Sequence, residues 1–589
     1  MLGRSGQDGV WLNLGHGSVG WTTSCASARL LSALIVGATP EIETEGLGID
    51  RFRRAVLISA HHRRPAFNSP DGSAMHRILA PTRRWPLHCS AATRQLETRA
   101  AAGLPPHALM QRAGDAVARL AMAIVPHAQH IWVAAGPGNN GGDGFEAAAR
   151  LQAAGKQVRL SWLGTATGAR SATADTLAAR ERAVAAGVQI DDRLPCPSDR
   201  FDLAIDALLG LGATRAPEGL LAEFIARLNA RGGPVLAIDL PSRLDADTGR
   251  PLGELCVRAD HTLSLLTLKP GLFTAQGRDQ AGAVWFDALG VLHDATPPDA
   301  WLTGAPAPAE LRLHAGHKGS FGDVAVVGGA VGMAGAALLA ARAAQAAGAG
   351  RVFVEWLPNT TAEAVGVDAL HPELMMRRDW SQSDAAVLAA ATVVCGCGGG
   401  DAVRNRLPRL LSLAGRLVLD ADALNAVATD PQFMMQLRAR AQRSLATVLT
   451  PHPLEAARLL GCDTATVQAD RLAAARELTA LTNCVVVLKG SGSITAAPGQ
   501  VPHLNGTGNG SLASGGTGDV LAGWLGGQWA QAGSHNAVDE LTLAFETASQ
   551  AVADHGAAAE PLQPGALPAS ELIQRLQHDL RCGRPAHRA

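Results

Sequence analysis

The chain has 589 residues, of which 47% are hydrophobic and 17% are charged, and its formal net charge is −1. This length and balance predict two or three globular domains, and the near-neutral charge argues against a nucleic-acid-binding surface. The most apolar stretch, residues 334–350, carries Arg342 and Gln345, so we expect a packed helix there and no membrane partner.

The nine cysteines are an odd number and lie scattered along the chain. They predict free thiols in a reducing cytoplasm rather than a disulfide framework. Cys395 and Cys397 form a C-x-C pattern without a second ligand pair nearby. Core or loop thiols are therefore a better interpretation of this pair than metal ligands.

The first 85 residues show no sustained helical or strand periodicity. Their apolar stretch, Leu30–Val36, is too short and too far from the start to belong to a signal peptide. We expect this extension to be poorly structured, or to reflect an over-extended start with Met75 as the true first residue.

From about Pro86 the sequence alternates between helical and strand patterns. The predicted helices span 91–102, 108–124, 145–154, 177–186 and 220–230, and the predicted strands span 130–135, 157–163, 203–206, 235–239 and 261–266. This alternation predicts a parallel sheet with helices on both faces, over a domain of residues 86–294.

Pro297, Pro298, Pro306 and Pro308 lie in a segment without periodicity, which predicts a linker over 295–309. A second α/β domain is then expected over 310–589. Its predicted elements are a helix at 335–347, strands at 321–327, 352–355, 393–395, 417–420, 447–449 and 485–488, and a last long helix that begins just after Gly518.

The first glycine-rich segment, GPGNNGGDG at 136–144, lies between a predicted strand and a predicted helix. It satisfies G-x-G-x-x-G, and the N–H groups at a helix N-terminus bind anions. The next strand lacks a terminal acid for a ribose, and the segment lacks a Walker A lysine. It therefore indicates a nucleotide or anion loop of another kind, in which Asn139, Asn140 and Asp143 add oxygens for a hard cation or ribose hydroxyls.

Two more predicted strands end on aspartates, Asp206 and Asp239, and Ser242 follows the second. Ligands of open α/β sheets bind beyond the carboxyl ends of the strands. Either aspartate alone would more often cap a turn or helix. Together with the glycine-rich segment, the two aspartates favour a site.

The second glycine-rich segment, SGGTGD at 514–519, precedes an apolar helix. In kinases of small alcohols an aspartate here takes the proton of the attacking hydroxyl while N–H groups hold the phosphoryl group. The alternative is a tight turn without chemistry.

Three further segments of the second domain carry polar groups. Lys489–Ser493, KGSGS, ends a strand and is suited to a nucleotide's phosphates or ribose, although lone strand-end lysines are usually only solvated. His452 lies on a rigid TPHP turn, where a lone histidine is more often structural. Asp420 and Asp422 suit either Mg²⁺ or helix capping.

Over about 86–290, GPGNNGGDG, DALLGLG and DLPSRLDADTG resemble the epimerase half of the bifunctional NAD(P)H-hydrate repair enzymes. The resemblance implies a Rossmann-like doubly wound domain, K⁺ bound by Asn140, Asp206 and Ser242, and Asp206 or Asp239 as the acid/base. The implied substrate contacts are Asn139, Asn140, Gly141, Gly142, Asp143, Gly210, Leu211, Gly212, Ala213, Thr214, Arg215, Ala216 and Asp239.

One residue departs from this family pattern. Arg243 stands where the family normally has glycine. If that turn needs a positive φ or a close ligand approach, an arginine strains it or crowds the site.

From about Glu310 onward, HKGSFGDVAVVGG, VLDADALN, LTPHPLEAARLLG, VVVLKGSGS and NGSLASGGTGDVLAG resemble the other half of these enzymes, the ADP-dependent NAD(P)H-hydrate dehydratase, which has a ribokinase-like fold. The resemblance implies ADP as co-substrate, Mg²⁺, and Asp519 as the catalytic base. Implied substrate contacts are Ala336, Gly398, His452 and Asp519, and implied nucleotide contacts are Lys489, Gly490, Ser491, Gly492, Ser493 and Gly518. Leu454 and the segment 395–400, CGCGGG, depart from the usual pattern.

The resemblance implies a metabolite-repair enzyme: the first domain interconverts R and S hydrates, and the second dehydrates the S hydrate to NAD(P)H, leaving AMP and phosphate. We expect hydrated NADH or NADPH and ADP as partners, no nucleic acid, and a homo-oligomer. One rival is a ribokinase-like small-molecule kinase, which would release a stable phosphorylated product. In the other, the first domain is a nucleotide- or partner-binding module without catalysis.

Overall fold

The structure is a computed structural model. It describes residues 2–4, 11–13, 75–78, 83–165, 172–212, 218–230, 232–291, 296–304, 312, 314–357, 366–532, 539–560 and 565–582. The chain divides into two compact units, Met1–Asp71 and Gly72–Ala589. In the first unit, β1 (Leu2–Arg4) and β2 (Trp11–Asn13) pair antiparallel. Most of the extension predicted over 1–85 lies outside the described residues.

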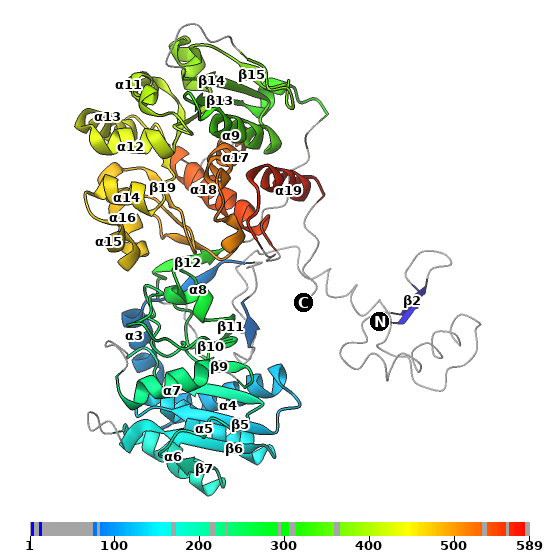
Figure 1. The fold of residues 1–589 in the computed structure, drawn as a ribbon, viewed down its shortest axis with the longest axis vertical. Helices are drawn as coiled ribbons and strands as arrows, with labels where there is room; N and C mark the ends of the chain where they lie inside the picture. The colour runs from blue at the N-terminus through cyan, green and yellow to red at the C-terminus, as the bar shows by residue number, and fades with distance from the viewer. Residues whose placement is uncertain are drawn as a thin grey trace. The chain divides into compact units, whose positions relative to one another are not determined.

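The second unit contains two sheets, and the first has eight strands (Figure 1). Their order is β3 (His76–Arg77), β11 (Ala283–Asp287), β10 (His261–Leu265), β9 (Val235–Ile238), β8 (Leu203–Ala207), β5 (His130–Ala135), β6 (Gln157–Trp162) and β7 (Gln189–Asp191). All neighbours are parallel except β3 and β11. Parallel strands need crossover connections, and helices supply most of them here.

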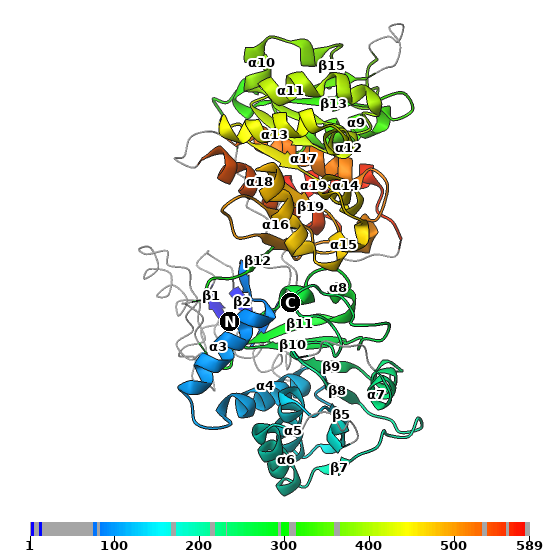
Figure 2. The same cartoon turned by 90° about the vertical axis from the view of Figure 1, so that its left-hand side faces the viewer.

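Helices cover both faces of this sheet. They are α3 (Ser90–Ala102), α4 (Ala108–Ile124), α5 (Asn139–Ala153), α6 (Ala174–Ala185), α7 (Leu220–Asn229) and α8 (Gly277–Gln280), with short 3₁₀ turns η2 (Leu163–Thr165) and η3 (Pro270–Leu272). Figure 2 shows α4, α5 and α6 on one side of the strands and α7 on the other. Two separate apolar clusters, one around Phe145 and one around Trp132 and Phe224, correspond to these two faces. The predicted doubly wound sheet is confirmed.

The second sheet has eleven strands, which are the remaining described strands of this unit. Their order is β15 (Met375–Met376), β14 (Arg351–Trp356), β13 (Asp323–Gly328), β16 (Thr392–Cys395), β17 (Arg416–Leu419), β18 (Thr447–Leu449), β19 (Val485–Leu488), β20 (Ile494–Ala496), β21 (His503–Asn505), β12 (Ala300–Thr303) and β4 (Trp85–Leu87). The strands from β15 to β19 are parallel, whereas β20 is antiparallel to both neighbours.

Two sets of helices pack on the second sheet. One set is α9 (Ala334–Ala346), α17 (Thr517–Gln531), α18 (Glu540–Ala557) and α19 (Ala569–Cys582). The other is α10 (Ala385–Ala390), α11 (Leu407–Leu413), α12 (Ala421–Thr429), α13 (Pro431–Gln442), α14 (Pro453–Leu460), α15 (Thr464–Ala469) and α16 (Arg471–Thr482). Short 3₁₀ turns are η4 (Lys318–Phe321), η5 (Trp380–Gln382), η6 (Asp401–Asn405) and η7 (Gly510–Leu512). Separate cores, around Trp524 and around Leu410, lie beneath the two sets.

Two strands connect the regions of the two sheets. β12 lies within the predicted linker, yet it pairs with β21 on one side and with β4 on the other. β4 lies at the predicted start of the first domain, so the second sheet is extended by chain from outside the second predicted domain. The domain bounds 86–294 and 310–589 stay predictions.

Several element predictions were wrong in detail. Asn139–Asp143, predicted as a loop, forms the first turns of α5, because its glycines allow α5 to approach neighbouring segments closely: a Cβ on Gly142 would overlap Met110 of α4. The helix expected just after Gly518 begins at Thr517, and it is not the last long helix because α18 and α19 follow. Both later helices lack a glycine-rich start.

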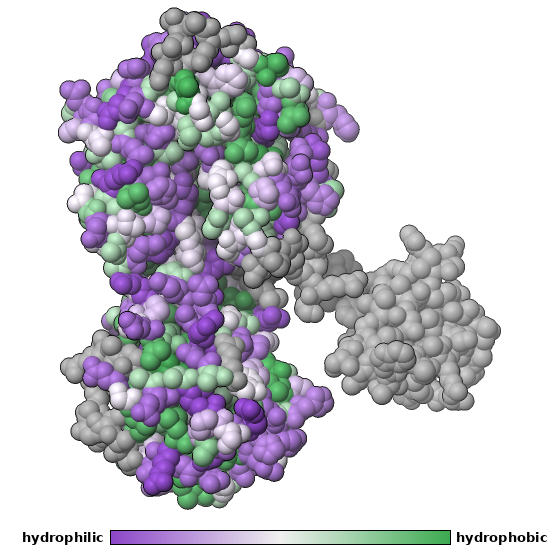
Figure 3. All heavy atoms as spheres, viewed as in Figure 1, coloured by the Kyte–Doolittle hydropathy of each residue, from purple (hydrophilic) through white to green (hydrophobic). Residues whose placement is uncertain are grey.

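On the face shown in Figure 3, polar and apolar residues are mixed over both α/β regions. Among the described helices, none combines the length and apolar character needed to cross a membrane.

Candidate functional site

A cavity of about 610 Å³ lies beyond the carboxyl ends of neighbouring strands in the first sheet. Residues that follow β5, β8, β9 and β10 line it, as the crossover topology predicts for an open α/β sheet. The predicted contacts Asn139, Asn140, Asp143, Gly210, Leu211, Gly212 and Asp239 all lie on its wall. Ala213, Thr214, Arg215 and Ala216 lie outside the described residues.

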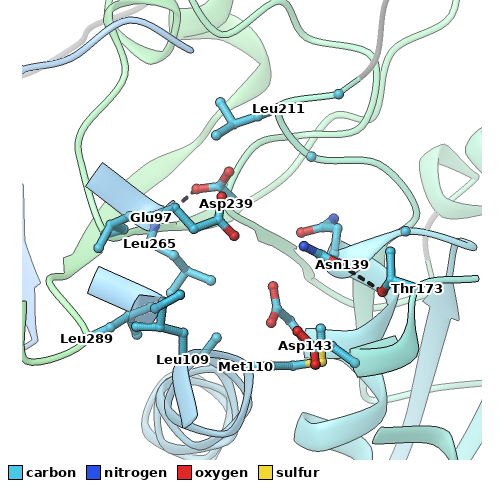
Figure 4. A pocket seen from close by; sticks show the side chains of 18 of the residues that line it. Glu97, Leu109, Met110, Asn139, Asp143, Thr173, Leu211, Asp239, Leu265 and Leu289 are labelled. Carbon is cyan, nitrogen blue, oxygen red and sulfur yellow. Dashed lines mark hydrogen bonds between the residues drawn. The ribbon is translucent and has the colours of Figure 1, made fainter. Parts of the chain in front are cut away.

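Four acidic residues line this cavity, and three of them, Glu97, Asp143 and Asp239, bear on its chemistry because the fourth, Asp175, is paired with His107. Figure 4 shows Glu97 and Asp239 close together, with Asp143 across the space from them. Burial raises the pKa of Asp143 well above its usual value, and the like charges of Asp239 and Glu97 add to the shift. Burial, and then the charge of Asp239, likewise raises the pKa of Glu97. The cavity therefore contains carboxyl groups suited to hold and transfer a proton.

Asp239 differs from the other two because a buried lysine compensates its charge. Lys269 is fully buried, and its Nζ donates to Oδ1 of Asp239 and to the Leu265 carbonyl oxygen, 2.7 Å away. The Leu265 N–H also donates to Oδ1 of Asp239, at 3.1 Å. Asp239 has a φ of 66°, an uncommon conformation for a non-glycine residue that fixed contacts must maintain. Its carboxylate is therefore held in one orientation toward the cavity.

Asp206, the second candidate acid/base, lies behind the cavity wall and is fully buried. Its Oδ1 accepts from Oγ of Ser242 at 2.6 Å and from the Leu208 N–H at 3.2 Å, and its Oδ2 accepts from the Ser242 N–H at 2.7 Å. Burial raises the pKa of Asp206 to about 6 despite these bonds. Its position suits a charged ligand site beside the Leu208–Gly210 turn better than proton transfer to substrate.

Asn140, Asp206 and Ser242 fit the predicted K⁺ site. Each borders the turn at Leu209: Oγ of Ser242 accepts from the Leu209 N–H at 2.9 Å, and a Cβ on Gly210 would lie 3.5 Å from Oδ1 of Asn140. All three donors are hard oxygens, which K⁺ prefers. The buried Nδ2 of Asn140 has no hydrogen-bond partner among the described residues. Within the same part of the chain, the buried carboxylate of Asp206 accepts hydrogen bonds only from the neutral N–H and hydroxyl groups described above. A cation would neutralise that charge.

Arg243 adopts the positive φ that the sequence analysis considered, at 77°. The side chain is buried, its guanidinium donates to the Leu252 carbonyl oxygen at 3.3 Å, and its Nε has no partner in the described part of the chain. Burial lowers the pKa of Arg243. It is not among the residues that line the cavity. The turn is strained by the arginine, but the cavity is not crowded by it.

A second group of polar residues lies beyond β16, β17 and β19 of the other sheet and at the start of α17. Sγ of Cys397, a carboxylate oxygen of Asp420 and a carboxylate oxygen of Asp519 all lie within 4.8 Å of one another. Burial raises the pKa of Asp519 to about 6, and the charge of Asp420 adds to this shift. Asp519 lies in the first turn of α17, whose N-cap is Gly516. A carboxyl group of raised pKa and N–H groups suited to a phosphate therefore occupy one helix end, as expected if Asp519 is a general base.

Lys489 connects the predicted nucleotide segment to this group. Its Nζ donates to Oδ1 of Asp420 at 2.6 Å, and a Cβ on Gly518 would lie 3.3 Å from the same Nζ. Burial alone would lower the pKa of Lys489, but the charges of Asp420 and Glu455 outweigh it and raise the value. A charged lysine thus lies against the start of α17, where phosphate oxygens would bind.

His452 caps α14 instead of projecting alone from its turn. Its Nδ1 accepts from the N–H groups of Leu454 and Glu455, at 3.1 and 3.3 Å, and its Nε2 lies 3.2 Å from Oε1 of Glu455. Burial raises the pKa of Glu455 to about 7. The histidine has the structural role that a lone histidine usually has, and its substrate contact stays a prediction.

Ala336 and Gly398 lie against each other, since a Cβ on Gly398 would meet the Cβ of Ala336 at 2.9 Å. Gly398 has a φ of 58° and follows Cys397 directly. Both residues are therefore near the Cys397–Asp420–Asp519 group, and their contacts with substrate stay predictions.

Comparison with known proteins identifies the family. Residues 106–271 match the family described as "YjeF-related protein N-terminus", and residues 324–576 match "NAD(P)H-hydrate dehydratase". The bifunctional NAD(P)H-hydrate repair enzyme Nnr of Escherichia coli (strain K12) is 35% identical over 475 residues, which cover 78% of this chain and 86% of that protein. The chain belongs to the bifunctional NAD(P)H-hydrate repair enzymes.

Other relatives agree with this assignment. The bifunctional NAD(P)H-hydrate repair enzyme of Leishmania braziliensis is 35% identical over 504 residues, or 80% of this chain and 88% of that protein. A solved ADP/ATP-dependent NAD(P)H-hydrate dehydratase from Bacillus subtilis, co-crystallised with ATP and Mg²⁺, is 30% identical, with a TM-score of 0.37 and coverage of 46% of this chain and 92% of that one. The two family matches and the curated relatives show that the chain is a bifunctional repair enzyme with epimerase and dehydratase domains.

In this repair enzyme, three site residues were not predicted from the sequence: Lys269, Glu97 and Cys397. Lys269 is followed by Pro270, and Glu97 lies inside an ordinary amphipathic helix, so neither has a motif around it. Cys397 was interpreted as a core thiol, and it is fully buried, but it also contacts the catalytic candidates. The helpful signal was position: Lys269 and Cys397 both follow sheet strands at their carboxyl ends.

Proposed function

We propose that the first domain interconverts the R and S hydrates of NAD(P)H and that the second converts the S hydrate and ADP into NAD(P)H, AMP and phosphate. One observation carries this proposal. Each domain holds, beyond its strand ends, a lysine–aspartate ion pair next to a further carboxyl group of raised pKa, Asp143 in one and Asp519 in the other.

In the second domain, Asp519 accepts the proton of the hydrate's hydroxyl group as its oxygen attacks the terminal phosphoryl group of ADP. The P–O bond to AMP breaks as the new P–O bond forms. The N–H groups at the start of α17 and the Lys489 ammonium hold the phosphoryl oxygens, where negative charge collects. Phosphate is a better leaving group than hydroxide, so the C–O bond then breaks, the neighbouring ring carbon loses a proton to solvent or to the departing phosphate, and the double bond of the reduced nicotinamide ring is restored.

The residues of this site also fit Mg²⁺. Asp420 offers the hard carboxylate oxygens that Mg²⁺ prefers, and it lies next to the proposed base Asp519 at the start of α17. When bound with ADP, Mg²⁺ would neutralise phosphate charge. Lys489 stays paired with Asp420 and orients the phosphates through its Nζ.

In the first domain, Asp239 is the acid/base that we favour, because it faces the cavity and Lys269 fixes its orientation. Asp143, across the cavity, keeps its proton to a higher pH than an ordinary carboxyl group. These two carboxyl groups, on opposite sides of the substrate, can donate a proton to the departing hydroxyl group as its C–O bond breaks with help from the electron pair of the ring nitrogen, and accept a proton from the water that then adds to the other face. K⁺ at Asn140, Asp206 and Ser242 would supply positive charge for the phosphates of the hydrate.

The products of the purified S hydrate with ADP test this proposal. We expect NAD(P)H, AMP and phosphate in equal amounts by chromatography. A stable phosphorylated nucleotide that accumulates without NAD(P)H would favour the kinase alternative.

Three finer assignments rest on the sequence alone. We keep as proposals the cytoplasmic location, the homo-oligomeric state and the domain bounds. The same product assay, run separately with NADH hydrate and NADPH hydrate, measures the preference between them.

A further inference from the structure

A short segment that follows Lys269 of the first candidate site in the chain makes contact with two loops of the second sheet. It follows β10 and begins next to Lys269, the lysine that pairs with Asp239 in the first cavity. The 3₁₀ turn Pro270–Leu272 is fully buried and leads directly into Phe273–Arg278, which we name the connecting segment. The connecting segment does not line the cavity. Its contacts are with loops of the second sheet.

The first of these loops is the predicted nucleotide segment, Lys489–Ser493. The Ala275 N–H and Oγ1 of Thr274 both donate to the Ser491 carbonyl oxygen, each at 3.2 Å. In return, Oγ of Ser491 donates to the Ala275 carbonyl oxygen at 2.8 Å. Three hydrogen bonds thus fix one residue of the nucleotide segment to the connecting segment.

A glycine in the nucleotide segment makes this contact possible. Gly492 is buried, with a φ of 65°, and a Cβ there would overlap the Phe273 carbonyl oxygen and approach Cα of Thr274 to 2.9 Å. Any other residue at this position would push the two segments apart. Gly492 therefore allows the close contact with the connecting segment, in addition to its predicted role in nucleotide binding.

A buried arginine joins the same contact from the second sheet. Nε of Arg471 donates to Oγ1 of Thr274 at 3.2 Å, while its Nη2 donates to the carbonyl oxygens of Leu488 and Lys489 at 3.3 and 3.2 Å. Thr274 is 2% exposed, so its hydroxyl exchanges hydrogen bonds away from solvent. The backbone of Lys489 is thereby linked through Arg471 to Thr274.

The second loop leads into the SGGTGD segment. Arg278 donates to the carbonyl oxygens of Gly506, Thr507 and Gly508, the last at 2.6 Å. On the other side of this loop, the Gly508 N–H donates to Oε1 of Glu560 at 2.9 Å. A guanidinium that binds three successive carbonyl groups fixes the backbone conformation where the chain approaches α17.

We infer that the connecting segment, through Thr274 and Arg278, positions both loops of the ADP site, so that the first domain sets the affinity of the second for ADP. The inference rests on the proposed function, since it assigns ADP to Lys489–Ser493 and the start of α17. Thr274 and Arg278 are positioning residues. They act through backbone groups of the loops and touch neither carboxyl cluster.

The test compares full-length variants in steady-state assays with the S hydrate. Arg278→Ala should raise KM for ADP about tenfold, the loss typical of a charge-assisted hydrogen bond, and Thr274→Val about threefold. The KM for the hydrate and the rate of R/S exchange should not change. Arg250→Ala, at an exposed arginine of the same region, serves as the matched control.

The outcomes separate this inference from the proposed function. Wild-type protein that forms no NAD(P)H with ADP would overturn both. Active wild-type protein with an unchanged KM for ADP in the variants would overturn only the positioning role. Equal losses in ADP affinity and R/S exchange would also overturn it, because they would indicate general destabilisation. If Arg278→Ala fails to fold by thermal melting, Thr274→Val decides the question.

Discussion

Asp519 illustrates how burial prepares a single side chain for catalysis. Its pKa of about 6 places the charged form in the majority at neutral pH, yet keeps the carboxylate more basic than an exposed one. Burial and the negative charge of Asp420 raise this pKa, and the buried, neutral thiol of Cys397 lies within 4.8 Å of both carboxyl groups. The base that we propose for the dehydratase site is thus tuned by burial and by its neighbours rather than by a motif alone.

A pH profile and a conservative substitution test this role. A base must be deprotonated, so the dehydratase kcat/KM should fall as pH decreases through about 6 and level off above it. Asp519→Asn should reduce kcat by at least about 1,000-fold and leave R/S exchange intact. A variant that keeps the wild-type profile would contradict the assignment.

Asp239 carries the corresponding prediction for the epimerase. Asp239→Asn removes the proton acceptor and should lower the rate of R/S exchange by at least about 100-fold. Dehydration of pure S hydrate should continue at the wild-type rate, which provides the folding control. The exchange rate is measured by chromatographic separation of the two hydrates. An unchanged rate would contradict the assignment of Asp239 and leave Asp143 or Glu97 as the acid/base.

Asp206 predicts a pH-dependent effect of K⁺ on stability. Its folded-state pKa, about 6, is higher than the ordinary value, so its contribution to stability is present at low pH and lost as pH rises through 6. K⁺ offsets this loss only when the carboxylate is charged. Replacing choline chloride with KCl should raise the melting temperature by about 5 °C at pH 7.5 and hardly at pH 5.

The matched control for the K⁺ effect is Asp206→Asn, which keeps the shape of the side chain and removes its charge. This variant should lose the K⁺ effect at both pH values. Equal shifts with K⁺ in wild type and variant would show that the ion binds elsewhere.

Among the local elements, the turn after β9 is the least expected, because a buried arginine occupies a position with a φ of 77°. Since Arg243 is not among the residues that line the cavity, Arg243→Gly should change the R/S exchange rate by no more than about twofold. A much larger gain on substitution would show that Arg243 obstructs the site.

The glycine-rich elements show what the sequence could and could not predict. The first lies after β5 and the second before an apolar helix, and these positions led to both candidate sites. The expected bounds of α4, β5, β18 and β19 are confirmed. The turns themselves were misassigned, because Asn139–Asp143 and Thr517 begin helices. Glycine disfavours helix in isolation, but close packing of α5 overrides that preference.

Partners distant in sequence were the other failure. The Asp239–Lys269 and Asp420–Lys489 pairs join residues from different strands, and no local pattern specifies which lysine meets which aspartate. Arg278 is similar, since its carbonyl partners lie more than 200 positions away. Topology brings these groups together, so they could be assigned only from the fold.

The two sheets also share chain across the expected linker. β12 lies in a proline-punctuated segment whose composition predicts irregular structure, yet it pairs with β21 and β4. Pairing with the two neighbouring strands provides hydrogen bonds for the backbone of β12, although its side chains show no alternating pattern. This sharing, together with the connecting segment, joins the two catalytic regions in one compact unit.

The central claim is that one chain repairs both hydrates. The most direct measurement incubates mixed R and S NADPH hydrates with ADP and Mg²⁺ and follows the absorbance of reduced nicotinamide. We predict full recovery, faster than the uncatalysed exchange of the R form. Recovery that stops at the S fraction would contradict the epimerase assignment, and no recovery by folded protein would contradict the dehydratase as well.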